Sequence, residues 1–388
     1  MKKTLLAAAL LAGFATAGVA QAETSVTLYG VVDSGYGYQN FKYNGPDGAG
    51  EMRQTKSGVR GDVNAGNRWG LRGSEDLGDG LRAIFTLEQG FNLGSGEFHS
   101  DRQWHRQSFL GLSSDDWGTF TIGRQYSAGS AFGVYRGPNG MSMGDNETVF
   151  GGVGVASADR VDNSFRYATP NLSGFNAILM YGTGTGTGGD TVGRYKGVGG
   201  DWEDYANRGN RVSVGLGYNN GPIGIGLSYD RQSNGDRDAI TNWVISGAYD
   251  FEVIKLMLAF GQDRHGKLGW DPKVPAIFNL TIAPDLPNVN SVLEPGDHSF
   301  KANNYAVGLS APVGGGSLYA GWSHSNSNLD DSDAWGRYAG NINTYQINYR
   351  YPLSKRTTVY AYGSYGTNLG YVRDLKGTEA GLGLTHAF

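Results

Sequence analysis

Apolar and polar residues alternate one by one through many short segments of this chain. In residues 81–91, one row of positions is apolar and holds Leu81, Ala83, Phe85 and Leu87. The row between them is polar and includes Arg82, Thr86 and Glu88. Successive side chains of a β-strand point to opposite faces, so this period of two predicts a strand with one apolar and one polar face.

Segments with this pattern recur along the chain, and we count sixteen of them. They cover residues 25–38, 68–75, 81–91, 102–113, 118–124, 163–169, 175–181, 212–218, 223–229, 243–249, 254–260, 305–309, 318–322, 345–351, 357–365 and 379–388. Short turns and long loops alternate between them. This arrangement predicts an all-β protein, a 16-stranded antiparallel transmembrane β-barrel with short periplasmic turns and long extracellular loops around a water-filled channel.

The alternation stops in the stretch from Tyr126 to Asp162, between the fifth and sixth predicted strands. This stretch is rich in small residues and carries charged side chains of both signs: Arg136, Asp145, Glu147, Asp159 and Arg160. Its local sequence is compatible with a surface loop or with a loop folded into the barrel. The strand count places it on the long-loop side, as the third extracellular loop, and leaves both alternatives open.

The N-terminus has the pattern of an export signal. Lys2 and Lys3 precede an apolar run over residues 5–19, and Ala20-Gln21-Ala22 is a small-residue cleavage site. We expect a signal peptide over residues 1–22 and a barrel over residues 23–388. The net charge of −4 gives no reason to expect a nucleic acid partner. The mean hydropathy of −0.38 suits a barrel whose polar channel offsets its apolar outer face.

Four segments, in order along the chain, carry a resemblance to a known family. They are Thr24–Asp33, Arg68–Gly78, Trp117–Gln125 and Leu384–Phe388. Together with the sixteen predicted strands, they resemble the trimeric general porins of Gram-negative bacteria, of the neisserial and burkholderial type. The resemblance covers essentially the whole chain after the export signal.

This resemblance implies a homotrimer of outer membrane pores for the passive transport of ions and small hydrophilic solutes. Each pore would be narrowed by the loop of residues 126–162. The implied partners are outer membrane lipid, lipopolysaccharide and the barrel-assembly machinery, which would read a C-terminal signal ending in Phe388. The resemblance also implies that loop acids face basic residues of the wall at a constriction, formed here by Arg68, Arg72, Arg82, Arg106, Arg160, Asp145 and Glu147.

Strand parity tests the basic residues independently. Arg68 and Arg82 alternate with apolar neighbours, so both are predicted to point into the channel. Arg106 has the parity of the apolar Leu110, so an inward Arg106 requires a bulge or an early end to the strand. Arg160 lies in the loop, where parity makes no prediction.

The proposed inward charges lean basic, which predicts weak anion selectivity. The same arginines also suit ion pairs with the loop acids, and the two roles are compatible. A substrate-specific outer membrane channel is the main alternative, although most aromatic residues fall in the outward row. A structural barrel with a blocked lumen is a further alternative.

We expect no enzymatic activity, no cofactor and no metal. The six histidines lack metal-ligand spacing, and the chain has no cysteine.

Overall fold

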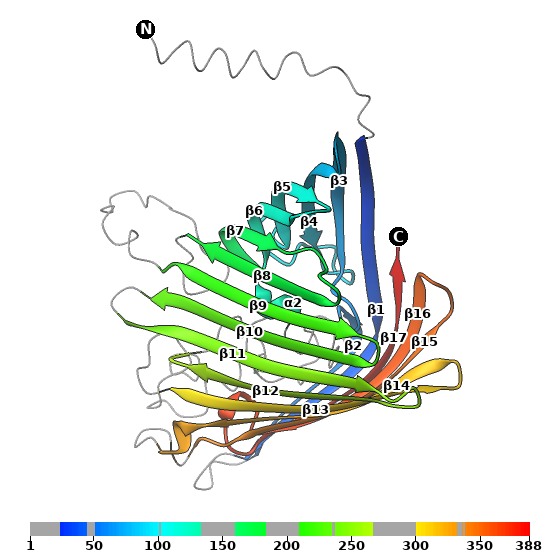
Figure 1. The fold of residues 1–388 in the computed structure, drawn as a ribbon. Coiled ribbons are helices and arrows are strands. Elements are labelled where there is room, and N and C mark those ends of the chain that lie inside the picture. The colour runs from blue at the N-terminus through cyan, green and yellow to red at the C-terminus, as the bar shows by residue number, and fades with distance from the viewer. Residues whose placement is uncertain are drawn as a thin grey trace, which may run out of the picture.

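A single antiparallel sheet forms almost the whole structure and closes into a barrel (Figure 1). The computed structural model describes residues 24–44, 51–100, 102–132, 160–183, 209–234, 237–266, 300–331, 336 and 338–388. Strand β1 pairs on one edge with β17, the last strand, so the sheet has no free edge at this seam. Closure pairs the backbone groups that lipid cannot hydrogen-bond, which is why a sheet can cross a membrane only as a barrel.

The sheet contains seventeen strand segments. They are β1 (Thr24–Asn44), β2 (Glu51–Gly61), β3 (Arg68–Gly78), β4 (Leu81–Gly90), β5 (Gln107–Ser114), β6 (Gly118–Tyr126), β7 (Arg160–Ala168), β8 (Phe175–Gly182), β9 (Arg211–Asn220), β10 (Ile223–Asn234), β11 (Arg237–Asp250), β12 (Lys255–Arg264), β13 (Lys301–Val313), β14 (Gly316–Ser327), β15 (Ile342–Pro352), β16 (Thr357–Thr367) and β17 (Leu375–Ala387). Short helices are α2 (Ala128–Phe132), η3 (Asn328–Asp331) and η4 (Leu369–Tyr371). Within the described ranges, no helix is long and apolar enough to cross a membrane.

Segments β2 and β3 together make one strand of the barrel. Both pair with the same edge of β1, β2 along Ser34–Asn44 and β3 along Thr24–Val31. Residues 62–67 leave the ladder between them. The seventeen segments therefore make sixteen barrel strands, which confirms the predicted count and the predicted fold class.

The two faces of the sheet confirm the predicted orientation of the apolar row. Large apolar side chains lie exposed on the outside, including Leu110 (64%) and Leu382 (64%). Charged and amide side chains are buried on the inside, including Asp33, Glu88, Arg211, Asp230, Asp263 and Asn304. An apolar exterior around a polar interior is the pattern expected when lipid surrounds the barrel and water fills it.

Buried apolar side chains form separate clusters. One lies towards the long-loop end of the barrel and contains Phe41, Tyr43, Phe300, Ala302, Leu329, Ala339, Ile342, Leu369, Tyr371, Val372 and Leu375. It joins strands from both sides of the seam with η3 and η4. Apolar packing therefore holds the outer rim together, and polar contacts line the middle of the wall.

Several strands extend further than predicted. The first continues past the predicted end at Tyr38 to Asn44, and residues 51–61, predicted as loop, form β2. Likewise, β10 reaches Asn234 and β11 starts at Arg237, where a wider gap was predicted. Segment β2 is mostly exposed along its length. In the added part of β1 the buried row holds Phe41 and Tyr43 while the row between them is polar, so the ladder continues although the pattern with an outward apolar row ends, and periodicity alone underestimates strand length.

Candidate pore constriction

A buried carboxylate on the inner face of β4 gathers three side chains from neighbouring elements. Glu88 is only 4% exposed. Its Oε1 accepts a hydrogen bond of 2.8 Å from Arg106 Nε, and its Oε2 lies 3.5 Å from Arg68 Nε. The Tyr29 hydroxyl donates to Oε2 over 3.1 Å. The wall thus brings two of the predicted arginines, Arg68 and Arg106, to the same acid.

Arg106 reaches this acid because β5 begins later than the sequence pattern predicts. The strand was predicted from residue 102, but its first ladder residue is Gln107. Trp104 has a positive φ of 57°, which turns the chain just before the ladder. Arg106 therefore escapes the outward parity of Leu110 and is 6% exposed. An early end to the strand was one of the two conditions required for an inward Arg106.

Tyr126 links Arg106 to a third arginine. Its hydroxyl accepts a hydrogen bond of 2.9 Å from Arg106 Nη2. It also accepts one from Arg160 Nη2, and the Arg160 Cζ lies 4.4 Å from the centre of the tyrosine ring. Arg160 is the first residue of β7 and pairs with Tyr126 across the ladder. The guanidinium groups of Arg68, Arg106 and Arg160 therefore line one continuous stretch of wall.

The remaining predicted site residues are placed differently. Arg72 lies further along the inner face of β3, with its Cζ 5.3 Å from the ring centre of Tyr29. Arg82 pairs with Asp115 over 2.6 Å beside the short turns, and the structure does not bring it to the Glu88 cluster. Asp145 and Glu147 lie outside the described residues, as does Arg136.

Sequence reasoning missed a second charged group beside this cluster. Asp162 accepts hydrogen bonds from Arg124 Nη1 at 2.6 Å and from Arg102 Nη2 at 3.0 Å. Tyr29 and Tyr126 were missed as well. Tyr29 falls in the polar-facing row of the first strand, so parity alone was enough to place it inside.

His105 adds an uncharged ring to the site. It precedes Arg106 in the segment between β4 and β5, outside the strands. Burial, reinforced by the positive charges of Arg160 and Arg106, lowers the pKa of the imidazole to about 4. The ring is therefore neutral at physiological pH, and it adds no charge to the arginine wall.

Helix α2 begins the long loop and packs against the inside of the barrel (Figure 1). The Ala128 amide donates to Ser213 Oγ over 2.8 Å. The Phe132 ring fills space that a Cβ at Gly215 or Gly217 would occupy, at 2.2 Å and 2.3 Å from its nearest ring atom. The first turn of the loop therefore lies inside the channel, as predicted, against a wall that only glycine leaves open.

Phe388 lies at the seam of the barrel. Its amide donates to the Gly30 carbonyl and its carbonyl accepts from the Gly30 amide, both over 3.1 Å. A Cβ at Gly30 would lie 2.3 Å from Phe388 Cζ, so the aromatic ring covers this glycine. The last residue thus completes the pairing that closes the sheet.

A closed sixteen-stranded barrel that is apolar outside and polar inside, with an arginine cluster on its inner wall and helix α2 packed inside it, defines a porin-type channel. The sequence profile of the Gram-negative porin family matches residues 7–371, and the chain belongs to this family. The predicted resemblance is thereby confirmed.

The relatives extend over the same length. An outer membrane porin protein of Bordetella pertussis is 39% identical, with 100% of both chains covered. Outer membrane porin protein 32 of Delftia acidovorans is 31% identical, covering 98% of this chain and 92% of its own. An anion-selective porin from Comamonas acidovorans has the same fold, with a TM-score of 0.66, 24% identity, and coverage of 94% and 100%. The protein is a general diffusion porin of the outer membrane.

Proposed function

We propose that this porin is weakly anion-selective and that Arg68, Arg106 and Arg160 set its selectivity. One observation carries the proposal. These three guanidinium groups converge on one carboxylate, Glu88, and one neutral phenol, Tyr126. These residues carry three positive charges against the one negative charge of Glu88, and the nearby Asp62, which also acts electrostatically on Arg106, reduces this excess without cancelling it.

The geometry gives this excess charge an effect on permeating ions. An arginine stays protonated at any working pH, and charges at a narrow mouth with low-dielectric walls act strongly on ions that pass. Anions gain favourable energy at such a belt, whereas cations are repelled. The field acts across water, so the preference is modest and neutral solutes still pass. A porin of the same fold from Comamonas acidovorans is anion-selective, so a barrel of this architecture can prefer anions.

We propose further that loop 126–162 forms the opposite side of the constriction, with Asp145 and Glu147 facing the arginines. Arg72 would continue the basic lining along the channel, and Arg82 would add charge near the short-turn rim. Infolding of α2 supports this placement, since the loop starts on the inner wall.

Other features of the proposal concern maturation and assembly. Residues 1–22 would be removed as a signal peptide. The mature chain would assemble as a homotrimer in contact with outer membrane lipid and lipopolysaccharide, after the assembly machinery has read the C-terminal strand ending in Phe388. The protein would act without a cofactor and without catalysis.

Reversal potentials in planar bilayers test the selectivity. Purified protein is reconstituted between two KCl solutions of different concentration, and the zero-current potential is measured. We expect the sign of the zero-current potential to show that chloride permeates more readily than potassium. A potential of the opposite sign would reject the proposal. A sugar that blocks the current with saturation would instead favour a substrate-specific channel.

A further inference from the structure

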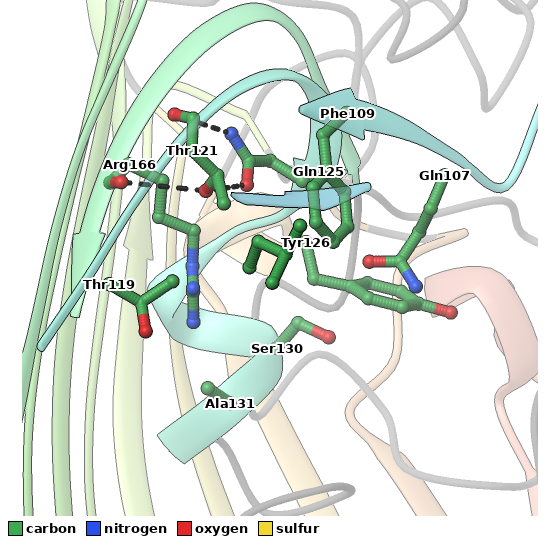
Figure 2. A pocket seen from close by; sticks show the side chains of 10 residues that line it. Gln107, Phe109, Thr119, Thr121, Gln125, Tyr126, Ser130, Ala131 and Arg166 are labelled. Atoms are coloured by element: carbon green, nitrogen blue, oxygen red, sulfur yellow. Dashed lines mark hydrogen bonds between the residues drawn. The ribbon is translucent and has the colours of Figure 1, made fainter. Parts of the chain in front are cut away.

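A cavity of about 290 Å³ lies between the inner wall and helix α2 (Figure 2). The Glu88 carboxylate is not part of its lining, although Tyr126, which accepts hydrogen bonds from Arg106 and Arg160, lines the cavity. Its lining comes from β4 to β7 and α2 and includes Ile84, Phe109, Thr119, Ser130, Ala131 and Arg166. Thr119 follows a short turn and Arg166 precedes another, so the cavity lies on the short-turn side of the arginine cluster.

Arg166 supplies a positive charge to this cavity. It alternates with the exposed Phe165 on β7 and therefore points inward, and Figure 2 shows its guanidinium directed towards α2. Its buried Nε has no hydrogen-bond partner, and no ion pair joins Arg166 to another described residue. Arg68, Arg106 and Arg160 differ, because Glu88 and Tyr126 already engage them.

Ser130 adds a second unsatisfied polar group from the opposite side. The residue is 2% exposed, and its Oγ has no partner among the described residues. Buried polar groups are normally hydrogen-bonded, so these two donors lack an acceptor. Both atoms have almost no accessible surface, so a ligand in the cavity would engage them after a small turn of each side chain. A guanidinium and a hydroxyl both donate, so the matching ligand is an acceptor with negative charge.

The rest of the lining restricts the chemical class further. Ile84, Phe109 and Ala131 give the cavity apolar walls, which an inorganic anion would leave unused. Ligand pockets range from about 300 Å³ upwards, so this cavity suits a small molecule only. We propose that the cavity is a binding subsite for small organic carboxylates, with Arg166 and Ser130 holding the carboxylate and Phe109 the apolar body. The proposal rests on the channel function, since the solute reaches the cavity through the pore.

Benzoate is a suitable probe, with benzamide as its neutral counterpart. Single-channel currents of the intact protein are recorded in KCl while each compound is added to either side. We expect benzoate to interrupt the current with saturation, and Arg166→Gln to weaken this block about tenfold or more through loss of a charge-assisted bond. Ser130→Ala removes the facing hydroxyl with a smaller change in the wall, and it should weaken the block as well.

Arg356→Gln is the matched control, because Arg356 is exposed on the short turn 353–356 at the same end of the barrel. It should leave the benzoate block unchanged. Equal block by benzamide, equal block in the Arg166 and Ser130 variants, or equal block by inorganic phosphate would each overturn the carboxylate assignment. The reversal potential is measured separately in KCl, so failure of this subsite is distinguishable from failure of the proposed anion selectivity.

Discussion

Arg106 Nε donates a hydrogen bond of 2.8 Å to Glu88 Oε1, and both side chains are almost completely buried in the inner wall. The contact joins a residue just before β5 to the strand that precedes it in the barrel. Arg106 also donates to the Tyr126 hydroxyl, which Arg160 shares. Glu88 therefore fixes the position of Arg106 within the cluster of Arg68, Arg106 and Arg160. The carboxylate therefore has two effects, since it orients Arg106 and cancels part of the positive charge.

Replacing Glu88 by glutamine separates these two effects. Glu88→Gln keeps an acceptor for Arg106 but removes the negative charge, so anion preference should increase. A unit charge about 8 Å away in water at about 0.15 M salt shifts an ion's energy by about 0.2 kcal/mol, in opposite directions for anions and cations, so the anion-to-cation permeability ratio should rise about twofold. Reversal potentials in a KCl gradient measure this ratio. A shift towards cations would contradict the net positive character of the belt.

Loss of two arginines should have the opposite effect. In the double variant Arg68→Gln and Arg160→Gln, the wall loses two positive charges while Glu88 remains, so selectivity should move towards cations. If the charges act independently, the permeability ratio should fall about fourfold. Arg356→Gln, at the exposed short turn, is the control and should leave the ratio unchanged. An unchanged ratio in the double variant would reject the assignment of these arginines.

The strand number was predictable because lipid imposes one apolar face on every strand, and that constraint appears directly in the sequence. It no longer applies where strands leave the bilayer, which is why β2 was predicted as loop. Arg68 followed from parity alone. Arg106 did not, since its direction depends on the positive φ of Trp104, and Arg160 depends on where β7 begins. Arg166 was predictable from its alternation with Phe165.

Glycines on the inner wall should control the position of the long loop. Gly215→Ala places a Cβ 2.2 Å from the Phe132 ring and 3.0 Å from Ala128 Cβ, so α2 must shift from the wall. We expect altered single-channel conductance and more frequent current transitions, because helix α2, which begins the long loop, no longer packs in a fixed position on the inner wall. Gly247→Ala is the matched control, since its nearest neighbour would be the Gly224 carbonyl at 3.9 Å. Identical conductance in both variants would show that α2 does not position the loop.

Selectivity should depend on pH through His105 only in acid. Because its pKa is lowered to about 4, the ring is neutral from pH 8 to pH 5 and gains a proton as the pH falls through about 4. The added positive charge beside Arg106 and Arg160 should then increase anion preference. Carboxylates also lose charge in this range, so the informative quantity is the difference between wild type and His105→Gln. That difference should be absent above pH 5 and appear below it. A difference centred near pH 6.5, the ordinary histidine value, would contradict the burial of this ring.

Closure of the barrel should depend on the fit between Gly30 and Phe388. In Gly30→Ala the new Cβ would lie 2.3 Å from Phe388 Cζ and 2.7 Å from the Arg68 carbonyl oxygen. The seam between β1 and the C-terminus must open slightly, so the fraction of protein that refolds should fall. This fraction is measured on SDS gels as the band of folded barrel that disappears when the sample is heated. Gly363→Ala is the control, because its closest neighbour would be at 3.6 Å.

A double variant tests the cause of this defect. Adding Phe388→Ala to Gly30→Ala removes the ring that clashes but leaves the contact with the Arg68 carbonyl. Refolding into detergent, where no assembly machinery is present, should therefore recover in part. Assembly in cells should not recover, because the proposed C-terminal signal has lost its aromatic residue. Recovery in both settings would show that Phe388 acts only by packing on Gly30, and recovery in neither would place the defect at the Arg68 carbonyl.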